Sequence, residues 1–273
     1  MTVRRTQRGL AAMFAAVAVA GLVVTGGQVA SAAPGGGSGG QKTSTLYDAV
    51  PVPLDGNMPS LGFEATQTRE FGDAVTFATG SNRSLQSVTV TLSSWGCEFG
   101  AHQTDDCVTT PGATFTHPIT FNVYGADGAT LIASKTQTFA IPFRPSASPK
   151  CTGTNAGKWY VSNEKRCTDG YAVNVTFTFP NVAVPASVVY GIAYNTTTAG
   201  YNPIGAAPCN TSGNPSGCGY DALNVGLTDE VIIGSTNEDE VWWNSALYGH
   251  PVFGPDTGWT DFVPAVQFKG ANK

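Results

Sequence analysis

Carboxylates are the side chains of this chain that best suit hydrolytic chemistry. A glycoside hydrolase needs two of them on opposite sides of a cleft, roughly 5–9 Å apart. Glu64, Glu70 and Glu98 are candidates, and they support one alternative function, a secreted polysaccharide hydrolase or lyase. Acidic residues in turn-rich segments are usually solvated. Their spacing does not pair any two of the three, so we assign no catalytic residue.

Histidine, serine and metal-ligand patterns are weaker indications of catalysis. His102, His117 and His250 are far apart, and none lies in an H-E-x-x-H motif. A G-x-S-x-G pattern occurs at 36–40, but a serine hydrolase needs it between a strand and a helix, and here it lies in a glycine-rich stretch. The acids between 229 and 240 do not follow EF-hand spacing. The sequence therefore indicates no metal site and no cofactor, and it favours binding over catalysis.

Aromatic residues next to amides are better candidates for a binding surface. Trp242 and Trp243 are adjacent, so in a strand they point to opposite faces and one of them should be exposed. Aromatic rings stack on the apolar faces of sugars, while neighbouring polar groups bind hydroxyls. The alternative is that these rings close the ends of the core. The predicted binding residues are Trp159, Tyr201, Asn202, Trp242, Trp243 and Asn244.

The six cysteines predict three local disulfide bonds. Six thiols allow fifteen pairings, but these fall into three pairs that are close in sequence, each enclosing a loop rich in Gly, Asn, Asp, Thr or Lys. Closing one such loop contributes about 2–3 kcal/mol. Zinc ligation is the alternative, and the C-x₂₋₄-C spacing that it usually needs is missing. The predicted pairs are Cys97–Cys107, Cys151–Cys167 and Cys209–Cys218.

Residues 1–32 have the pattern of a secretory signal peptide. Arg4, Arg5 and Arg8 precede an apolar run over 10–24, and the small residues at 30–32 form a cleavage site. The apolar run is shorter than the roughly 20 residues that a membrane-spanning helix needs. We expect cleavage before Ala33, secretion to the extracellular space with or without loose attachment to the cell wall, and no membrane insertion afterwards.

The charge of the secreted chain argues against anionic partners. Removing the signal peptide removes three arginines and no acid, which leaves 11 basic against 19 acidic residues. Binding of nucleic acid or of an anionic membrane needs clustered Lys and Arg. We therefore expect neither partner. A polysaccharide or a cell-wall glycan suits this charge better, and the sequence has no signal for an oligomeric state.

Hydrophobic residues alternate with a period of two through most of the chain after the signal peptide. Val, Thr, Phe and Tyr fill these alternating runs, and clusters of Pro, Gly, Asn and Asp separate them. We predict a Gly/Ser-rich linker over 33–45 and a single domain over 46–273, an antiparallel β-sandwich or jelly roll without a long amphipathic helix. About nine strands are predicted, near residues 71–77, 88–92, 119–123, 129–141, 173–179, 188–194, 223–227, 241–248 and 265–268.

Three segments resemble a family of secreted actinobacterial proteins. They are 70–77 (EFGDAVTF), 83–98 (RSLQSVTVTLSSWGCE) and 191–205 (GIAYNTTTAGYNPIG). The alanine-rich signal peptide and the sparse lysine fit that origin. The resemblance implies a secreted β-sandwich over most of the domain. Since the family has no established activity, it implies no functional residue.

These features together predict a secreted, non-catalytic binding domain for carbohydrate or the cell envelope. The alternatives are the hydrolase or lyase described above, on a jelly-roll scaffold, and a structural protein of the envelope or matrix. In that last case the threonine-rich faces of the sheets would mediate assembly.

Overall fold

The computed structural model describes residues 43–80, 83–101, 104–195, 222–237, 239–260 and 262–271. The predicted signal peptide, most of the predicted linker, Tyr201, Asn202, Cys209 and Cys218 lie outside these residues. Residues 41–273 form one compact unit. Its first strand begins at Thr43, three residues before the predicted domain boundary. The start of this strand is polar, so hydrophobic alternation does not reveal it.

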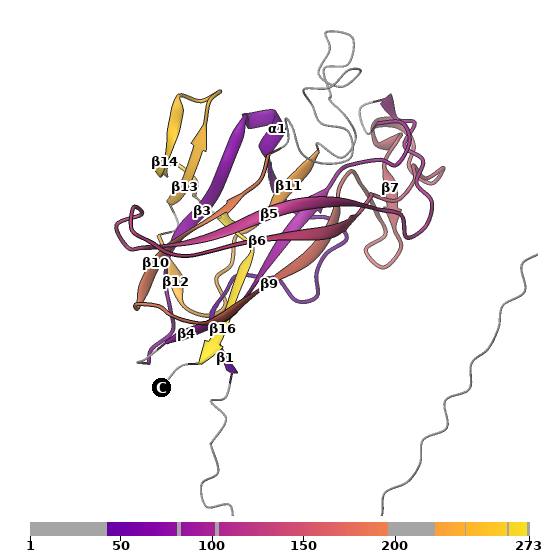
Figure 1. The fold of residues 1–273 in the computed structure, drawn as a ribbon. Helices are drawn as coiled ribbons and strands as arrows, with labels where there is room; N and C mark the ends of the chain where they lie inside the picture. The colour runs from indigo at the N-terminus through magenta and orange to yellow at the C-terminus, as the bar shows by residue number, and fades with distance from the viewer. Residues whose placement is uncertain are drawn as a thin grey trace, which may run out of the picture. The chain divides into compact units, whose positions relative to one another are not determined.

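Two antiparallel sheets in a sandwich-like arrangement form the fold (Figure 1). We call the first the β4 sheet, after the strand that pairs with three others. Its seven strands are β1 (Thr43–Asp48), β16 (Val266–Ala271), β4 (Ser84–Ser94), β11 (Leu223–Thr228) and β15 (Val263–Pro264) along the main path, with β2 (Ser60–Gly62) paired to β11 and β9 (Tyr171–Ala183) paired to β4.

The second sheet is called the β10 sheet, after a central strand that is buried almost throughout. Its seven strands are β14 (His250–Thr257), β13 (Glu240–Ser245), β3 (Thr68–Thr76), β10 (Ser187–Ala193), β5 (Thr114–Gly125) and β6 (Leu131–Pro142), with β12 (Ser235–Thr236) paired to β3.

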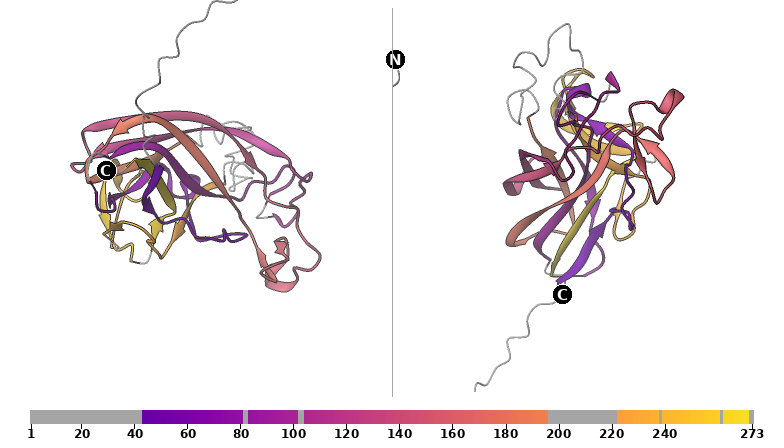
Figure 2. Two further views of the ribbon diagram at one scale, coloured as in Figure 1. Left: turned by 90° about the horizontal axis from the view of Figure 1, so that it is seen from below. Right: turned by 90° about the vertical axis from the view of Figure 1, so that its right-hand side faces the viewer.

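A separate two-stranded hairpin joins β7 (Trp159–Val161) to β8 (Arg166–Thr168). It projects from the two sheets in every view (Figures 1 and 2), and a single 3₁₀ turn, η2 (Gly153–Asn155), precedes it. The helix α1 (Phe63–Thr66) is one turn long and lies between β2 and β3. Among the described residues, no helix is long and apolar enough to cross a bilayer.

The nine predicted strands are all present, and the structure adds seven more. The strands that the sequence missed are short or polar. β2, β12 and β15 have two or three residues, too few to establish a period. β14 contains Pro251 and Pro255, which an edge strand tolerates because one side of its backbone needs no ladder partner.

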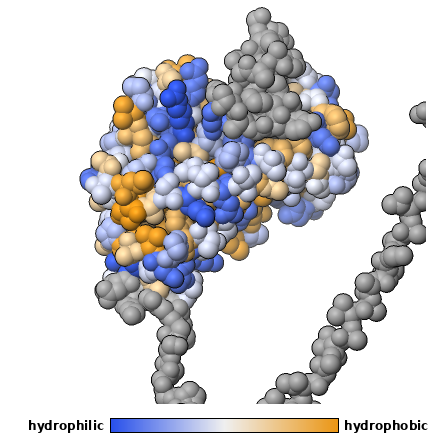
Figure 3. Space-filling view, in the orientation of Figure 1, coloured by the Kyte–Doolittle hydropathy of each residue, from blue (hydrophilic) through white to orange (hydrophobic). Residues whose placement is uncertain are grey.

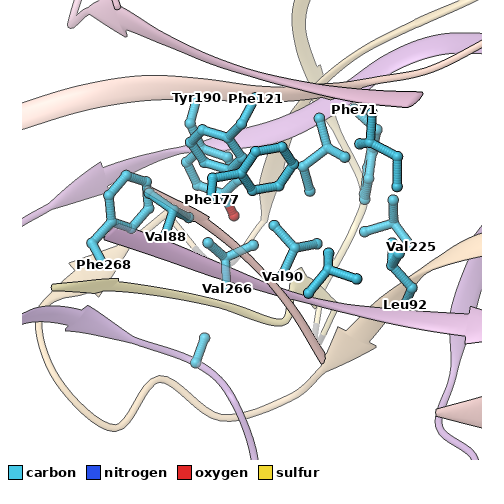
Figure 4. Packing of buried hydrophobic residues seen from close by; sticks show 14 of the residues in the cluster. Phe71, Val88, Val90, Leu92, Phe121, Phe177, Tyr190, Val225, Val266 and Phe268 are labelled. Carbon is cyan, nitrogen blue, oxygen red and sulfur yellow. The ribbon is translucent and has the colours of Figure 1, made fainter. Parts of the chain in front are cut away.

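The core is an aromatic cluster between the two sheets (Figure 4). Phe121 and Tyr190 of the β10 sheet stack with ring centroids 5.5 Å apart. Phe268 of the β4 sheet packs edge-on against both, at 5.6 and 5.4 Å. All three side chains are fully buried. Burying such rings removes the most apolar surface per residue, so this cluster joins the sheets into one packed unit.

Two of the predicted disulfides are confirmed. Cys97–Cys107 and Cys151–Cys167 have Cα separations of 5.4 and 5.8 Å. No cysteine of the described residues is free. Such bonds persist in oxidising compartments, so they indicate that the chain folds outside a reducing cytoplasm. The third predicted pair, Cys209–Cys218, lies outside the described residues.

Arg144 contacts the second disulfide loop and the segment directly before the first. Its side chain is fully buried, and Nη2 donates to the carbonyl oxygen of Gly157 at 2.6 Å. The backbone N–H of Arg144 donates to the carbonyl of Gly96, beside the first disulfide loop. Nη1 lies 4.0 Å from the carboxylate of Asp169. The guanidinium of Arg144 therefore holds the second disulfide loop, while its backbone N–H bonds to the segment directly before the first.

Candidate functional site

A cavity lies where β4 ends and β11 begins. Its volume is about 1020 Å³, and it is open to solvent. Four segments of the chain line it: residues 55–65, which run from the loop before β2 through β2 into α1, the residue after β4, the β7–β8 hairpin, and residues 222–224 at the start of β11. We call it the Trp95 pocket, and its lining residues are Asp55, Asn57, Met58, Pro59, Ser60, Gly62, Glu64, Ala65, Trp95, Glu164, Arg166, Ala222 and Asn224.

Trp95 is the aromatic residue of this pocket. It follows β4 directly, and its backbone N–H donates to the carbonyl of Ala222 at 3.0 Å, which holds it beside β11. Its indole Nε1–H donates to Ser93 Oγ at 3.0 Å. Ser93 in turn donates to Asn57 Oδ1 at 2.7 Å. With its polar edge held in this way, the half-buried indole presents an apolar surface to the pocket.

Gly170 makes this arrangement sterically possible. A Cβ at this position would lie 2.3 Å from Ser93 Oγ and 2.5 Å from both Asn57 Oδ1 and Trp95 Nε1. No larger residue fits without moving all three groups. Glycine is used where another chain segment approaches the backbone this closely.

Charged residues of the β7–β8 hairpin fix the loop that precedes β2. Glu164 accepts the backbone N–H of Gly56 at 2.5 Å and forms an ion pair with Arg166. Arg166 also donates through Nη2 to the carbonyl of Asn57 at 2.9 Å. Both hairpin residues therefore act on the loop as well as lining the pocket. The Cys151–Cys167 disulfide closes this hairpin next to Arg166, so it supports one wall of the site.

The opposite wall comes from β2, α1 and β11. Asn224 Nδ2 donates to Ser60 Oγ at 3.1 Å across the β2–β11 pair. Phe63 stacks on Tyr194 with ring centroids 3.9 Å apart, and this anchors α1. Gln67 then ends the helix in a left-handed conformation, with φ of 51°. Glu64 is thereby held half-buried at the pocket.

The lining combines an aromatic ring, two asparagines, one serine and several charges. Three carboxylates line the pocket, from Asp55, Glu64 and Glu164, against one guanidinium from Arg166. Arg166 is already paired with Glu164. A ring for stacking surrounded by groups that bind hydroxyls is the composition of small polar-ligand sites. Within the described residues, no group of three or more His, Cys, Asp or Glu side chains is arranged to hold a metal ion.

The two adjacent tryptophans lie on opposite faces of β13, as predicted. Trp243 is 4% exposed and belongs to the core, where its Nε1–H donates to Asp256 at 2.9 Å. Trp242 lies on the other face and is half-buried. A Cβ on Gly128, in the turn between β5 and β6, would lie 2.0 Å from the Trp242 ring, and Phe253 packs beside it. The outward-facing indole is therefore covered by a turn that is distant in sequence.

Trp159 and Asn244, two of the other predicted binding residues, have structural roles. Trp159 is 9% exposed, so little of its ring is accessible to a ligand. Its Nε1–H donates to the carbonyl of Gly170 at 2.6 Å. Trp159 thus holds the backbone of Gly170, the residue that lies against Ser93, Asn57 and Trp95. Asn244 uses its Oδ1 to accept the backbone N–H groups of Arg69 and Glu70.

The three candidate catalytic carboxylates are not brought together. Glu64 lines the Trp95 pocket, whereas Glu70 and Glu98 do not. Glu70 lies on β3 and accepts the hydroxyl of Tyr124 at 2.9 Å and the amide of Asn122 at 2.8 Å. Glu98 accepts the backbone N–H of Thr110 at 2.6 Å, across the first disulfide loop. The predicted hydrolytic residues therefore do not form a pair.

Two other parts of the surface are less suited to polar ligands. A second cavity of about 640 Å³ is lined by prolines, by Trp159, Tyr160 and Tyr171, and by small residues without charge. The β13–β14 hairpin exposes Tyr248 and Val252, and Figure 3 shows hydrophobic residues interspersed with hydrophilic ones on the face viewed there. A hairpin tip lacks walls, so it offers stacking without enclosed hydrogen-bonding groups.

Sequence reasoning missed Trp95, Asn57 and Asn224 as site residues. The local signal was a tryptophan directly after a strong strand, in Ser93-Ser94-Trp95. Nothing local connects it to asparagines 38 residues before it and 129 residues after it in the chain. Only the pairing of β4 with β11, and of β11 with β2, brings them together.

No protein-family model, no curated protein and no solved structure matches this chain. The resemblance to secreted actinobacterial proteins therefore stays a prediction, and the function is argued from the geometry of the Trp95 pocket.

Proposed function

We propose that this chain is a secreted domain that binds carbohydrate in the Trp95 pocket without transforming it. The observation that supports this most directly is the Trp95 indole, fixed by Ser93 through its polar edge and surrounded by amide and carboxylate groups. Stacking on such a ring with hydrogen bonds to hydroxyls is how sugars are held. The disulfide-closed hairpin and the Gly170 contact keep this lining in place before ligand arrives, which reduces the entropic cost of binding.

Replacement of Trp95 tests this function. Trp95→Ala removes the stacking surface, so we expect the affinity for oligosaccharides that bind the wild-type chain to fall at least about tenfold, equivalent to about 1.4 kcal/mol. Isothermal titration with a panel of soluble hexasaccharides measures this. Tyr160→Ala is the matched control because it removes an aromatic ring from the second cavity. If Tyr160→Ala abolishes binding and Trp95→Ala does not, the assignment to this pocket is wrong.

A polysaccharide hydrolase or lyase is the second candidate. Two carboxylates in one pocket, from Asp55 and Glu64, favour it. In that case the same oligosaccharides would be shortened on prolonged incubation, and Glu64→Gln would stop the cleavage. Unchanged chain lengths by mass spectrometry, together with retained binding, support the non-catalytic proposal. The jelly-roll connectivity and the Cys209–Cys218 bond stay predictions from the sequence.

A further inference from the structure

The second cavity has an uncharged interior lined by rings. Its volume is about 640 Å³, which is within the range of small-molecule sites. Among the described residues that line it, there is no Asp, Glu, Lys, Arg or His. Trp159, Tyr160 and Tyr171 supply aromatic surface, and prolines supply further apolar surface. The interior therefore suits the ring of a ligand better than a charged group, which would lose its hydration there without a partner.

Contacts behind the aromatic lining hold it in place. Trp159 donates its Nε1–H to the carbonyl of Gly170 at 2.6 Å, and its ring meets that of Tyr171 edge-on with centroids 5.6 Å apart. Tyr171 begins β9, so its backbone is fixed through the β4 sheet. A ring that enters the cavity therefore meets aromatic surface that is already arranged. The phenol groups of Tyr160 and Tyr171 can bond a hydroxyl group on such a ring.

A lysine ammonium group lies at the rim of this cavity. Lys150 Nζ is 4.8 Å from the centroid of the Tyr160 ring, and the Lys150 side chain is exposed. Asp169 is the acid of this region, and it is engaged by Lys158 at 3.4 Å and by Arg144 at 4.0 Å. Within the described residues, Lys150 forms no ion pair. Its charge is therefore open to an anion that arrives from solvent.

The position of Lys150 over Tyr160 is fixed by a turn and a disulfide. The backbone N–H of Cys151 donates to the carbonyl of Ser148 at 2.9 Å, and the N–H of Lys150 donates to Ser148 Oγ at 3.3 Å. Cys151 is bonded to Cys167, which is the strand partner of Tyr160. The turn that carries Lys150 and the strand that carries Tyr160 are thus covalently joined, and Ser148 lines the cavity itself.

An uncharged interior and a cation at its rim select a ligand with the complementary pattern. The ligand should have an apolar, preferably aromatic, ring that enters the cavity and one anionic group that stays outside. An anion at the rim keeps part of its hydration, so its attraction to an ammonium group is not cancelled by the cost of burial. A ligand with a positive charge would be repelled by Lys150, and a neutral ring would lack one of the two contacts.

We propose that the second cavity binds small aromatic carboxylic acids, of which 4-hydroxycinnamate is an example, with the ring inside and the carboxylate on Lys150. This site is separate from the Trp95 pocket, and the inference does not depend on carbohydrate binding. Proline-rich peptides also dock in grooves lined by aromatic residues. They would not require Lys150, so the experiment can distinguish them.

The test compares four probes on the full chain at about pH 7, where carboxylates are ionised and lysine is protonated. They are 4-hydroxycinnamate, the corresponding neutral alcohol, 3-cyclohexylpropanoate and a hexapeptide of proline. We expect 4-hydroxycinnamate to bind about fivefold more tightly than the alcohol, which lacks the charge, and than 3-cyclohexylpropanoate, which lacks the aromatic ring. Isothermal titration gives the dissociation constants.

Variants assign the two contacts to residues. Lys150→Gln is expected to weaken 4-hydroxycinnamate binding about fivefold and to leave binding of the alcohol unchanged. Lys135→Gln is the matched control, because it removes one positive charge from an exposed position that does not line the cavity. Tyr160→Ala should weaken both probes at least tenfold, and Trp95→Ala should weaken neither. Lys150 is exposed, so its variant tests the inference even if Tyr160→Ala does not fold.

Each remaining outcome contradicts the inference. Equal affinity for 4-hydroxycinnamate and the alcohol, or the same loss in Lys150→Gln and Lys135→Gln, removes the role of Lys150. Hexaproline that binds more tightly than 4-hydroxycinnamate makes the cavity a peptide site. Loss of 4-hydroxycinnamate binding in Trp95→Ala, with binding kept in Tyr160→Ala, places the acid in the Trp95 pocket. A chain that binds none of the ring probes overturns the proposal and leaves carbohydrate binding to its own test.

Discussion

At the scale of single residues, Asp73 is a fully buried carboxyl group. It lies on β3, opposite Tyr190 of β10. Its Oδ1 accepts the backbone N–H of Ala74, and its Oδ2 lies 2.6 Å from Thr236 Oγ1. That hydroxyl is also 2.8 Å from the carbonyl of Ala74, which can only accept. The pattern is complete when Thr236 donates to Ala74 and Asp73 carries a proton on Oδ2.

The surroundings of Asp73 agree with a neutral acid. Burial raises the pKa of Asp73 from 3.8 to about 8; the hydrogen bonds with Thr236 and with the backbone of Ala74 oppose this only in part, and the charge of Glu240 adds to it. The hydroxyl oxygens of Tyr47 and Tyr190 are buried and have no hydrogen-bond partner among the residues that the structure describes. Burial is also the largest cause that raises the pKa of both tyrosines, so both stay neutral and add no negative charge beside Asp73.

We predict that stability falls as the pH rises from about 4 to about 8. In this window the folded chain keeps a proton on Asp73 that the unfolded chain has released, so unfolding becomes easier with each pH unit. Asp73→Asn has the same shape and donates to Thr236 at every pH, so it should remove most of this slope. Urea unfolding at pH 5 and pH 8 measures it. An equally steep slope in the variant contradicts a protonated Asp73.

At the scale of elements, the β7–β8 hairpin links the disulfide framework to the site. It lies outside both sheets, and short local pairing alone would leave it weakly held. The Cys151–Cys167 bond, the buried guanidinium of Arg144 and the Trp159–Gly170 hydrogen bond fix it instead. Because Glu164 and Arg166 line the Trp95 pocket, the geometry of one wall depends on these three contacts.

We predict that removing this disulfide affects both stability and binding. The bond spans a sequence separation of 16 residues, so replacing both cysteines by alanine should lower the free energy of unfolding by about 3 kcal/mol. It should also weaken oligosaccharide binding, since Arg166 adjoins Cys167. Replacing Cys97 and Cys107 is the control, because that loop does not line the pocket. Equal loss of binding in both double variants would place the effect in global stability and contradict a local role.

At the scale of the whole molecule, the aromatic cluster makes the two sheets one cooperative unit. Phe268 packs against the rings of Tyr47, Phe77, Phe121 and Tyr190. Tyr47 belongs to the β4 sheet, Phe121 and Tyr190 belong to the β10 sheet, and Phe77 directly follows β3. Removing it leaves a cavity at the centre of the sandwich. The two sheets should therefore lose stability together.

We predict that Phe268→Ala lowers the free energy of unfolding by about 3–5 kcal/mol. Circular dichroism and tryptophan fluorescence should report the same shifted midpoint, because one packed core joins the sheets. Phe99→Ala is the control, since this ring is 62% exposed and its loss should change stability by less than about 0.5 kcal/mol. Two separate transitions in the wild-type chain would contradict a shared core.

The sequence located the strands with clear hydrophobic alternation, and it missed the short and polar ones. Period-two alternation located nine strands because a half-buried strand records its burial in every second residue. Close spacing identified Cys97–Cys107 and Cys151–Cys167 because a short loop brings its own ends together. Alternation also placed Trp242 and Trp243 on opposite faces of β13. Alternation did not indicate that Gly128 covers Trp242, because these two residues are more than one hundred positions apart in the chain.

Only the tertiary structure decided which residues line the site. The Trp95 pocket brings together four segments between Asp55 and Asn224, and no local pattern records their proximity. Trp159, a predicted binding residue, instead donates a hydrogen bond to the carbonyl of Gly170. Its sequence position gave no sign of this contact. Local periodicity determines which face of a strand is buried. The packing of distant strands determines which polar groups meet, and in this protein those groups are the ones that can bind a ligand.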